Sequence, residues 1–181
     1  QDWVLCRTSP TTMMDEAAAV ALFQRTDKDG SGEVCCNELQ TMLAECGICF
    51  SLQTVMQLIR QHDKTKSGAL SLQEFVDLHQ FLIRMQSSYQ YFDQSRTGAL
   101  QGAEVERALQ HAGFTLDGQV LAQVCKIFDP LRTNALSFDQ FISVTIFLKS
   151  CTDTFVAFDP QRTGMIHLDL NQFIWAATKT R

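Results

Sequence analysis

The chain has 181 residues, of which 45% are hydrophobic, and a formal net charge of −5. This length and composition exclude a disordered tail, because such a chain can bury a sizeable core as one domain or two tightly joined lobes. The negative charge argues against a nucleic-acid partner, which would need a basic patch.

The N-terminal segment gives no sign of a secretory signal or a membrane anchor. Residues 1–10, QDWVLCRTSP, lack the charged and apolar regions of a signal peptide, and no run of 18 apolar residues follows. We therefore expect a soluble, cytoplasmic protein, with a nuclear location or recruitment to membranes as alternatives. A chain that begins at Gln1 is expected to be trimmed or processed.

Five copies of one short pattern run along the rest of the chain, each headed by an aspartate. The intervals between these aspartates are 36, 30, 36 and 30 residues, and the five are Asp27, Asp63, Asp93, Asp129 and Asp159. One copy alone could be a surface turn, but five spaced copies exclude that interpretation. The spacing predicts an all-α protein of five helix–loop–helix units, or hands, over residues 12–181, after an N-terminal extension at 1–11.

The first copy, DKDGSGEVCCNE at residues 27–38, matches the twelve-residue calcium loop of an EF-hand with one substitution. Calcium is a hard cation that takes about six to eight oxygen ligands. Gly32 permits the sharp turn at position 6, and Cys35 at position 9 is a poor ligand in a slot that water often fills. The expected ligands are Asp27, Asp29, Ser31, the carbonyl of Glu33 and the bidentate Glu38.

A break at residues 47–51 follows the first hand and would let the first two hands pair, with Val34 opposite Leu70. This break overlaps the sequence CGIC at residues 46–49. The seven cysteines lack the spacing of a disulfide framework, so we expect reduced thiols. A zinc or redox role is the alternative, although no second CxxC or histidine pair completes a zinc site.

The second copy, DKTKSGALSLQE at 63–74, and the third, DQSRTGALQGAE at 93–104, each have two carboxylates at ligating positions. Because calcium affinity falls with ligand charge, we rank the first loop strongest, the third next and the second weakest. The ligands expected in the third loop are Asp93, Ser95, Thr97, the carbonyl of Ala99 and Glu104. Those of the second loop, as a weak site, are Asp63, Thr65, Ser67, the carbonyl of Ala69 and Glu74.

Two stretches without proline or glycine, residues 75–92 and 141–158, have apolar residues at intervals of three and four. We predict that each is one continuous helix shared by two successive hands. The break at residues 113–118 would let the third and fourth hands pair, with Leu100 opposite Leu136.

The fourth copy, DPLRTNALSFDQ at residues 129–140, has lost the ligand set. Leu131 removes the ligand at position 3, Asn134 replaces the glycine, and Gln140 replaces the bidentate acid. We expect no calcium in this loop.

The fifth copy, at residues 159–172, begins like the others, but its position 12 falls on Leu170. The apolar residue that follows position 12 in the other copies reappears two places late, as Phe173, which predicts a two-residue insertion in a structural loop. Ile166 at position 8 has no partner loop in its own chain. Since an unpaired strand segment needs cover, we predict a homodimer, or a heterodimer with a close relative, through Ile166, Phe173 and Trp175.

From about Thr12 to the C-terminus, the alternating spacing and the late insertion resemble the penta-EF-hand family. The uninterrupted first loop and the segment DKTKSG at 63–68 are similar to the family's group of apoptosis-linked adaptor and peflin. The resemblance implies a calcium sensor that exposes an apolar surface with Ca²⁺ and recruits protein or peptide partners, including proline-rich ones, with calcium-dependent membrane association as a further possibility.

Two other functions remain open at this point. One is a passive calcium buffer, which binds the ion without uncovering apolar surface. The other is a regulatory subunit of a calpain-like protease. Catalysis by the chain itself is not expected, because no nucleophile motif or glycine-rich phosphate loop stands out from the repeat.

Overall fold

The structure, a computed structural model, describes residues 14–179, so the predicted N-terminal extension at 1–11 lies outside the described residues. The described residues form eight helices and four short strands, which confirms the all-α class. The chain divides into two compact units, Gln1–Gly98 and Ala99–Arg181, and each is described by itself.

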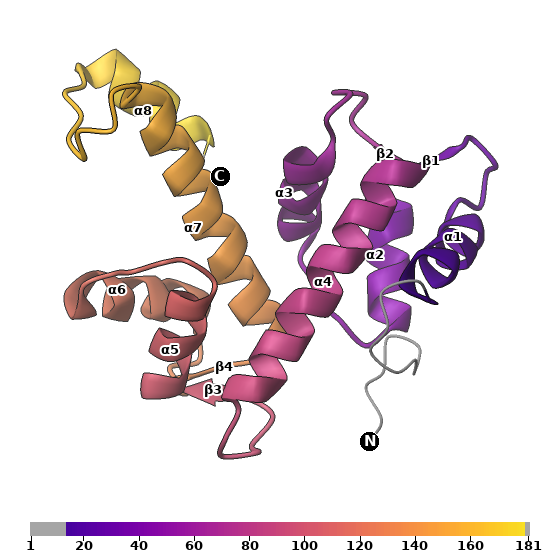
Figure 1. Cartoon of the computed structure of the whole chain (residues 1–181), viewed down its shortest axis with the longest axis horizontal. Helices are drawn as coiled ribbons and strands as arrows, with labels where there is room; N and C mark the ends of the chain where they lie inside the picture. The colour runs from indigo at the N-terminus through magenta and orange to yellow at the C-terminus, as the bar shows by residue number, and fades with distance from the viewer. Residues whose placement is uncertain (1–13, 180–181) are drawn as a thin grey trace. The chain divides into compact units, whose positions relative to one another are not determined.

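Unit 1 contains the first two hands, and its last helix leads into the first half of the third loop. Its two strands pair antiparallel, with Glu33 opposite Ser71 and Val34 opposite Leu70, as predicted (Figure 1). This short ladder joins the first two loops. The elements in chain order are α1 (Met14–Thr26), β1 (Glu33–Val34), α2 (Cys36–Glu45), α3 (Leu52–His62), β2 (Leu70–Ser71) and α4 (Leu72–Phe92).

Helix α4 forms the spine of unit 1 and contacts α1, α3 and both strands. It runs unbroken for 21 residues and starts three residues before the predicted segment, because Ser71 and Glu74 form a capping box at its first turn. Phe75 of α4 is 1% exposed and meets the ring of Phe23 of α1 edge-on, with centroids 5.5 Å apart. This packing anchors the outgoing helix of the second hand against the incoming helix of the first.

Unit 2 contains the end of the third loop and the fourth and fifth hands. Its strands pair antiparallel with Leu100 opposite Leu136, as predicted. The elements are β3 (Leu100–Gln101), α5 (Ala103–His111), α6 (Gly118–Phe128), β4 (Ala135–Leu136), α7 (Phe138–Phe158) and α8 (Leu170–Lys179). Asp117 caps α6 by accepting the N–H groups of Gln119 and Val120 at 3.0 and 2.8 Å.

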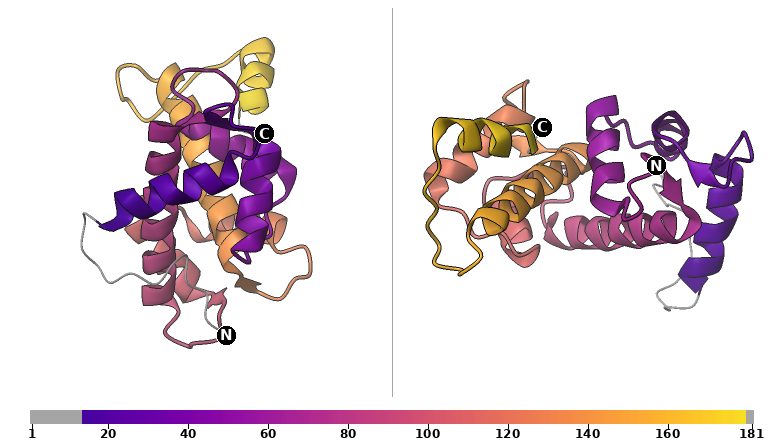
Figure 2. Two further views of the ribbon diagram at one scale, coloured as in Figure 1. Left: turned by 90° about the vertical axis from the view of Figure 1, so that its right-hand side faces the viewer. Right: turned by 90° about the horizontal axis from the view of Figure 1, so that it is seen from above.

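Helix α7 is the second shared helix, and its apolar residues build the core of unit 2. Phe141, Ile142, Val144 and Ile146 are fully buried. By length and composition alone α7 could also cross a membrane, with a mean hydropathy of 1.4 over its most apolar window, 33% of which is buried. The apolar residues of α7 that are not in this core include Phe155 and Val156, at 37% and 49% exposure. Helix α8 packs against α7 (Figure 2).

Candidate functional site

The aspartate at position 1 closes each of the first three loops in the same way. Its carboxylate accepts the backbone N–H groups of positions 5 and 6 at 2.9 to 3.1 Å. These donors are Ser31 and Gly32 for Asp27, Ser67 and Gly68 for Asp63, and Thr97 and Gly98 for Asp93. The glycine at position 6 has a positive φ, of 82° at Gly32, which an L side chain rarely adopts. The repeated sequence pattern therefore produces a repeated loop geometry.

In the first loop three carboxylates converge. Oxygens of Asp27, Asp29 and Glu38 all lie within 4.8 Å of one another, the one such group among the described residues. The Ser31 hydroxyl donates a hydrogen bond to the Glu33 carbonyl at 2.9 Å. The two other oxygen ligands predicted for this loop therefore lie side by side. This set of hard oxygens fits Ca²⁺, and these five residues could hold it.

Hydrogen bonds favour the ionised form of two of these carboxylates. The Ser31 hydroxyl and N–H lower the pKa of Asp29. The Cys35 N–H is the largest cause of the lowered pKa of Glu38. Partial burial acts in the opposite direction, and further hydrogen-bond donors add to the lowering. These hydrogen bonds keep Asp29 and Glu38 deprotonated, which favours binding of a cation.

Glu38 also links the two ends of its loop. One carboxylate oxygen accepts the Lys28 N–H at 3.0 Å, and the other accepts the Cys35 N–H at 3.0 Å. Cys35 is the N-cap of α2, and Glu38 lies in the first turn of that helix. A change in what the Glu38 carboxylate binds is thus transmitted directly to α2.

In the second loop, hydrogen bonds from within the protein occupy the carboxylate at position 12. Glu74 is 3% exposed and accepts four hydrogen bonds, from the N–H groups of Lys64 (2.8 Å), Thr65 (3.0 Å) and Ser71 (2.9 Å) and from the Ser71 hydroxyl (2.7 Å). Although burial acts to raise the pKa of Glu74, these donors lower it to about 2. Asp63 contributes the second acid of this loop, and Thr65 donates to it at 3.1 Å.

The third loop continues from unit 1 into unit 2, and the structure describes its two halves separately. In unit 1 the Ser95 hydroxyl donates to Asp93 at 3.2 Å and lies 3.2 Å from the Thr97 hydroxyl. In unit 2 Glu104 is 9% exposed and accepts the Gln101 N–H at 3.1 Å. The bond from Gln101 to Glu104 matches the bond from Cys35 to Glu38 in the first loop, since both run from the position 9 N–H to the position 12 carboxylate.

In the fourth loop, uncharged side chains and backbone N–H groups make the hydrogen bonds that hold the loop in shape. Asp129 is 4% exposed and accepts the Thr133 hydroxyl at 3.1 Å and the Asn134 N–H at 2.7 Å. Asn134 adopts a φ of 56°, which asparagine tolerates better than most residues. The Gln140 side-chain oxygen accepts the Ser137 N–H at 2.9 Å, so it caps α7 without supplying the bidentate charge.

The fifth loop contains the predicted two-residue insertion. Asp159 accepts the N–H groups of Thr163 and Gly164 at 2.8 and 2.7 Å, as in a normal loop. The bond from the position 9 N–H to the position 12 side chain then runs from Asp169 to Gln172, at 3.0 Å. This pair stands two places later than a twelve-residue loop would put it, so the extra residues lie between Gly164 and Asp169.

The predicted interface residues lie on or near α8, which has no buried residue within Leu170–Lys179. Phe173 is 62% exposed and Trp175 is 51% exposed, while Ile166 is half-buried. The Trp175 ring meets Phe158 of α7 edge-on, with centroids 5.6 Å apart. Ile166 lies outside the four strands of the described residues.

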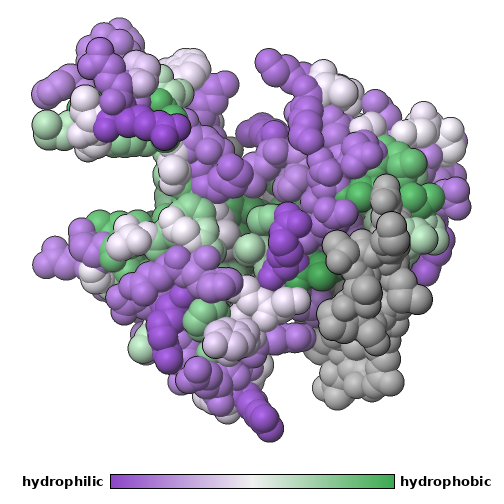
Figure 3. Space-filling view, in the orientation of Figure 1, coloured by the Kyte–Doolittle hydropathy of each residue, from purple (hydrophilic) through white to green (hydrophobic). Residues whose placement is uncertain are grey.

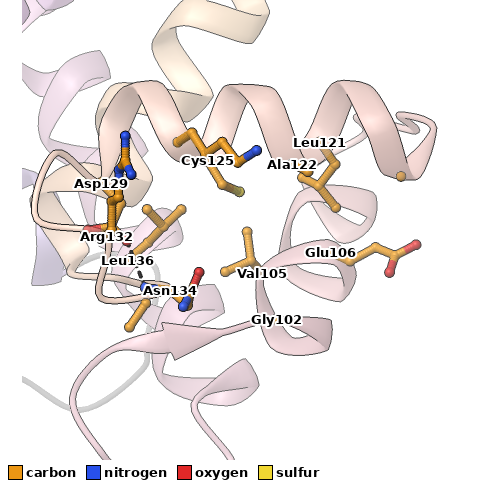
Figure 4. Close-up of a pocket in the computed structure, with 13 residues that line it drawn as sticks. Gly102, Val105, Glu106, Leu121, Ala122, Cys125, Asp129, Arg132, Asn134 and Leu136 are labelled. Atoms are coloured by element: carbon orange, nitrogen blue, oxygen red, sulfur yellow. Dashed lines mark hydrogen bonds between the residues drawn. The ribbon is translucent and has the colours of Figure 1, made fainter.

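The cysteines and one cavity complete the set of candidate sites. The described cysteines, at 35, 36, 46, 49, 125 and 151, form no disulfide with one another. A cavity of about 590 Å³ lies between α5, α6 and the fourth loop (Figure 4). Sequence reasoning missed this cavity because residues from separate elements line it and no linear motif marks it.

Comparisons with known proteins agree with this geometry. Residues 16–80 match the family model of an EF-hand domain pair. Human peflin is 30% identical over 158 residues, which are 86% of this chain and 56% of peflin. Mouse sorcin is 28% identical over 148 residues, which are 79% of this chain and 74% of sorcin. The chain thus spans little more than half the length of the peflins it matches.

A solved structure matches along nearly the whole chain. It is a homolog of programmed cell death 6 protein from Leishmania major, with a TM-score of 0.68 and 30% sequence identity, and the match covers 94% of this chain and all of that one. The five loops with their alternating spacing, the late insertion in the fifth and these relatives together show that the chain is a calcium-binding protein of the penta-EF-hand family.

Proposed function

We propose that this protein is a calcium sensor and adaptor, and not an enzyme. The observation that carries the proposal is the position of Glu38, whose two carboxylate oxygens join both ends of the first loop to the first turn of α2. Calcium, when bound, supplies a double positive charge that attracts about six to eight oxygens. Its ligands are those proposed for the first loop (Asp27, Asp29, Ser31, Glu33, Glu38) and the third loop (Asp93, Ser95, Thr97, Ala99, Glu104).

Binding of calcium to the first loop would move helix α2. To place both oxygens on a cation, the Glu38 carboxylate would exchange its bonds to the N–H groups of Lys28 and Cys35, wholly or in part, for ligation of the ion. Because Glu38 lies in the first turn of α2, that exchange reorients the helix and uncovers apolar side chains beneath it. The buried residues of α2 that such a movement would expose are Leu39 and Leu43, at 0% exposure, and Met42, at 7%.

Titration calorimetry of Glu38→Gln, together with binding of a hydrophobic dye, tests this proposal. We expect the variant to lose one strong calcium site and most of the calcium-induced dye fluorescence, because an amide cannot supply a bidentate carboxylate. Glu45→Gln, at the exposed end of α2, is the matched control. If the wild type binds calcium without a change in dye fluorescence, the protein is a buffer; if Glu38→Gln binds like the wild type, the first loop is not the switch.

We also propose that the protein forms a homodimer, or a heterodimer with a relative, through its fifth hand. In support, the exposed apolar residues of α8 include Leu170, Phe173, Ile174 and Trp175, at 72%, 62%, 52% and 51% exposure. A row of large apolar side chains on one short helix is costly in water, and a second copy of the same hand would cover it. A cytoplasmic location, with calcium-dependent recruitment to membranes, is part of the same proposal.

A further inference from the structure

The cavity in unit 2 has an apolar interior and an open mouth. In Figure 4 the side chains of Val105, Leu121, Cys125 and Leu136 face one another across it. Its volume of about 590 Å³ is within the usual range for small-ligand pockets, about 300 to 1,000 Å³. Burial, and then the Asp129 carboxylate, raise the pKa of the Cys125 thiol, so Cys125 is a neutral lining group. Apolar surface is visible over α6 at the left of Figure 3.

The two walls of this cavity are held in different ways. The fourth loop forms one wall, and the Thr133 hydroxyl and the Asn134 N–H hold it by donating to Asp129. Helix α5 forms the opposite wall with Gly102, Val105 and Glu106 around its first turn. Glu104, position 12 of the third loop, is the neighbour of Val105 in that turn. The wall on α5 is therefore attached to a calcium loop, whereas the facing wall is not.

Charge is distributed unevenly around the mouth. Arg132 of the fourth loop and Lys126 of α6 are exposed lining residues. Asp129, the acid beside them, is buried, and donors of its own loop occupy its oxygens. The other acid, Glu106, lies at the opposite end of the cavity in Figure 4 and accepts the Gln110 amide at 3.3 Å. The end formed by the fourth loop is therefore cationic.

We propose that this cavity is the partner site controlled by the third hand, and that its occupant is a short acidic peptide segment of another protein. One apolar side chain of the segment fills the space between Val105, Leu121 and Leu136, and an adjacent aspartate or glutamate pairs with Arg132. A peptide suits the cavity better than an acyl chain because Asn134, Arg132 and Lys126 make part of its lining polar. This inference rests on the proposed calcium switch.

The test is selection of a random octapeptide library on the full 181-residue chain in calcium. Fluorescence anisotropy of the selected peptides then gives affinities for the wild type and its variants. Leu121→Trp fills the cavity and Arg132→Glu reverses the charge at its mouth. Lys149→Glu is the matched control, because it reverses an exposed charge on α7 that is not among the lining residues. Circular dichroism and calcium titration show whether each variant is folded and loaded.

We expect peptides that combine aspartate or glutamate with an adjacent leucine, isoleucine or phenylalanine. Their affinity should fall about tenfold or more in Leu121→Trp, in Arg132→Glu and in chelator, and stay unchanged in Lys149→Glu. Selected peptides that bind Leu121→Trp as well as the wild type would overturn the cavity as partner site and leave the calcium switch intact. Equal affinity with and without calcium would overturn control by the third hand. If calcium binds and no peptide is selected, both the cavity site and the adaptor function fail.

Discussion

Lys64 and Asp77 form an ion pair, with Nζ 2.6 Å from Oδ2, that joins the start of the second loop to α4. The Lys64 N–H also donates to Glu74 at 2.8 Å. One lysine thus ties both the loop backbone and the outgoing helix in place, next to the acid that closes the loop. We predict that a cation must compete with these bonds to bind the second loop, in addition to the weak affinity expected from its low ligand charge.

Glu74→Gln is expected to lower the free energy of unfolding in chelator by about 1.5 to 3 kcal/mol, because hydrogen bonds to a charged acceptor contribute about that much. Urea unfolding at neutral pH in the presence of chelator measures the loss. Glu38→Gln is the matched control: its carboxylate is more exposed and accepts the N–H groups of Lys28 and Cys35, so the loss should be smaller. Equal losses in the two variants would show that Glu74 does not hold the second hand.

The contribution of Glu74 should also depend on pH. Its pKa is lowered from 4.5 to about 2 in the folded protein, so folding favours the deprotonated carboxylate. The stabilisation is complete above about pH 4.5 and is lost progressively as the pH falls towards about 2. The difference in urea stability between the wild type and Glu74→Gln should therefore shrink from pH 5 to pH 3. A difference that stays constant over that range would contradict the assignment.

The fourth loop should regain calcium when its three missing groups are restored together. Leu131→Asp supplies a ligand at position 3, Asn134→Gly relieves the left-handed backbone at φ 56°, and Gln140→Glu supplies the bidentate acid. Calorimetry should show one additional calcium per chain in the triple variant. Gln140→Glu alone is the control and should add none, because Leu131 still blocks position 3. An unchanged stoichiometry in the triple variant would mean that the loop backbone itself excludes the ion.

The spacing of the repeat is enough to predict the two strand pairs and the two shared helices. Because position 8 of each loop is fixed by counting from the aspartate, the pairs Val34–Leu70 and Leu100–Leu136 follow from the sequence alone. The predicted start of α4 is three residues late, because the closing acid of a loop already lies inside the helix that follows.

Two other features could not be read from the repeat. The Lys64–Asp77 pair depends on a long side chain that reaches 13 residues along the chain, and the loop motif does not specify this contact. The cavity in unit 2 is formed by parts of two hands, and its shape depends on how α5 and α6 pack. Side-chain geometry between elements, rather than the ligand pattern, decides both.

The N-cap of α8 should stabilise this helix of the fifth hand. Asp169 accepts the Gln172 N–H at 2.8 Å, and Gln172 in turn accepts the Asp169 N–H at 3.0 Å. Asp169→Ala removes the first of these bonds and should cost about 1 kcal/mol of helix stability. Hydrogen exchange of the α8 amides should become faster, while the amides of α7 stay protected. Asp153→Ala, which removes an exposed pair with Lys149 on α7, is the control and should leave α8 unchanged.

Phe173→Asp should dissociate the proposed dimer. Phe173 lies in α8 directly after Gln172 and is 62% exposed, so its ring is available for contact with a second copy. An unpaired carboxylate buried at that contact would be costly. Sedimentation velocity at micromolar concentration should show a dimer for the wild type and a monomer for the variant. Tyr91→Ser is the matched control: Tyr91, at 73% exposure, is an aromatic side chain on α4 of unit 1 and is not part of the fifth hand. Since the substitution lies outside the first three loops, calcium binding should be retained, and a dimer in Phe173→Asp would move the interface away from α8.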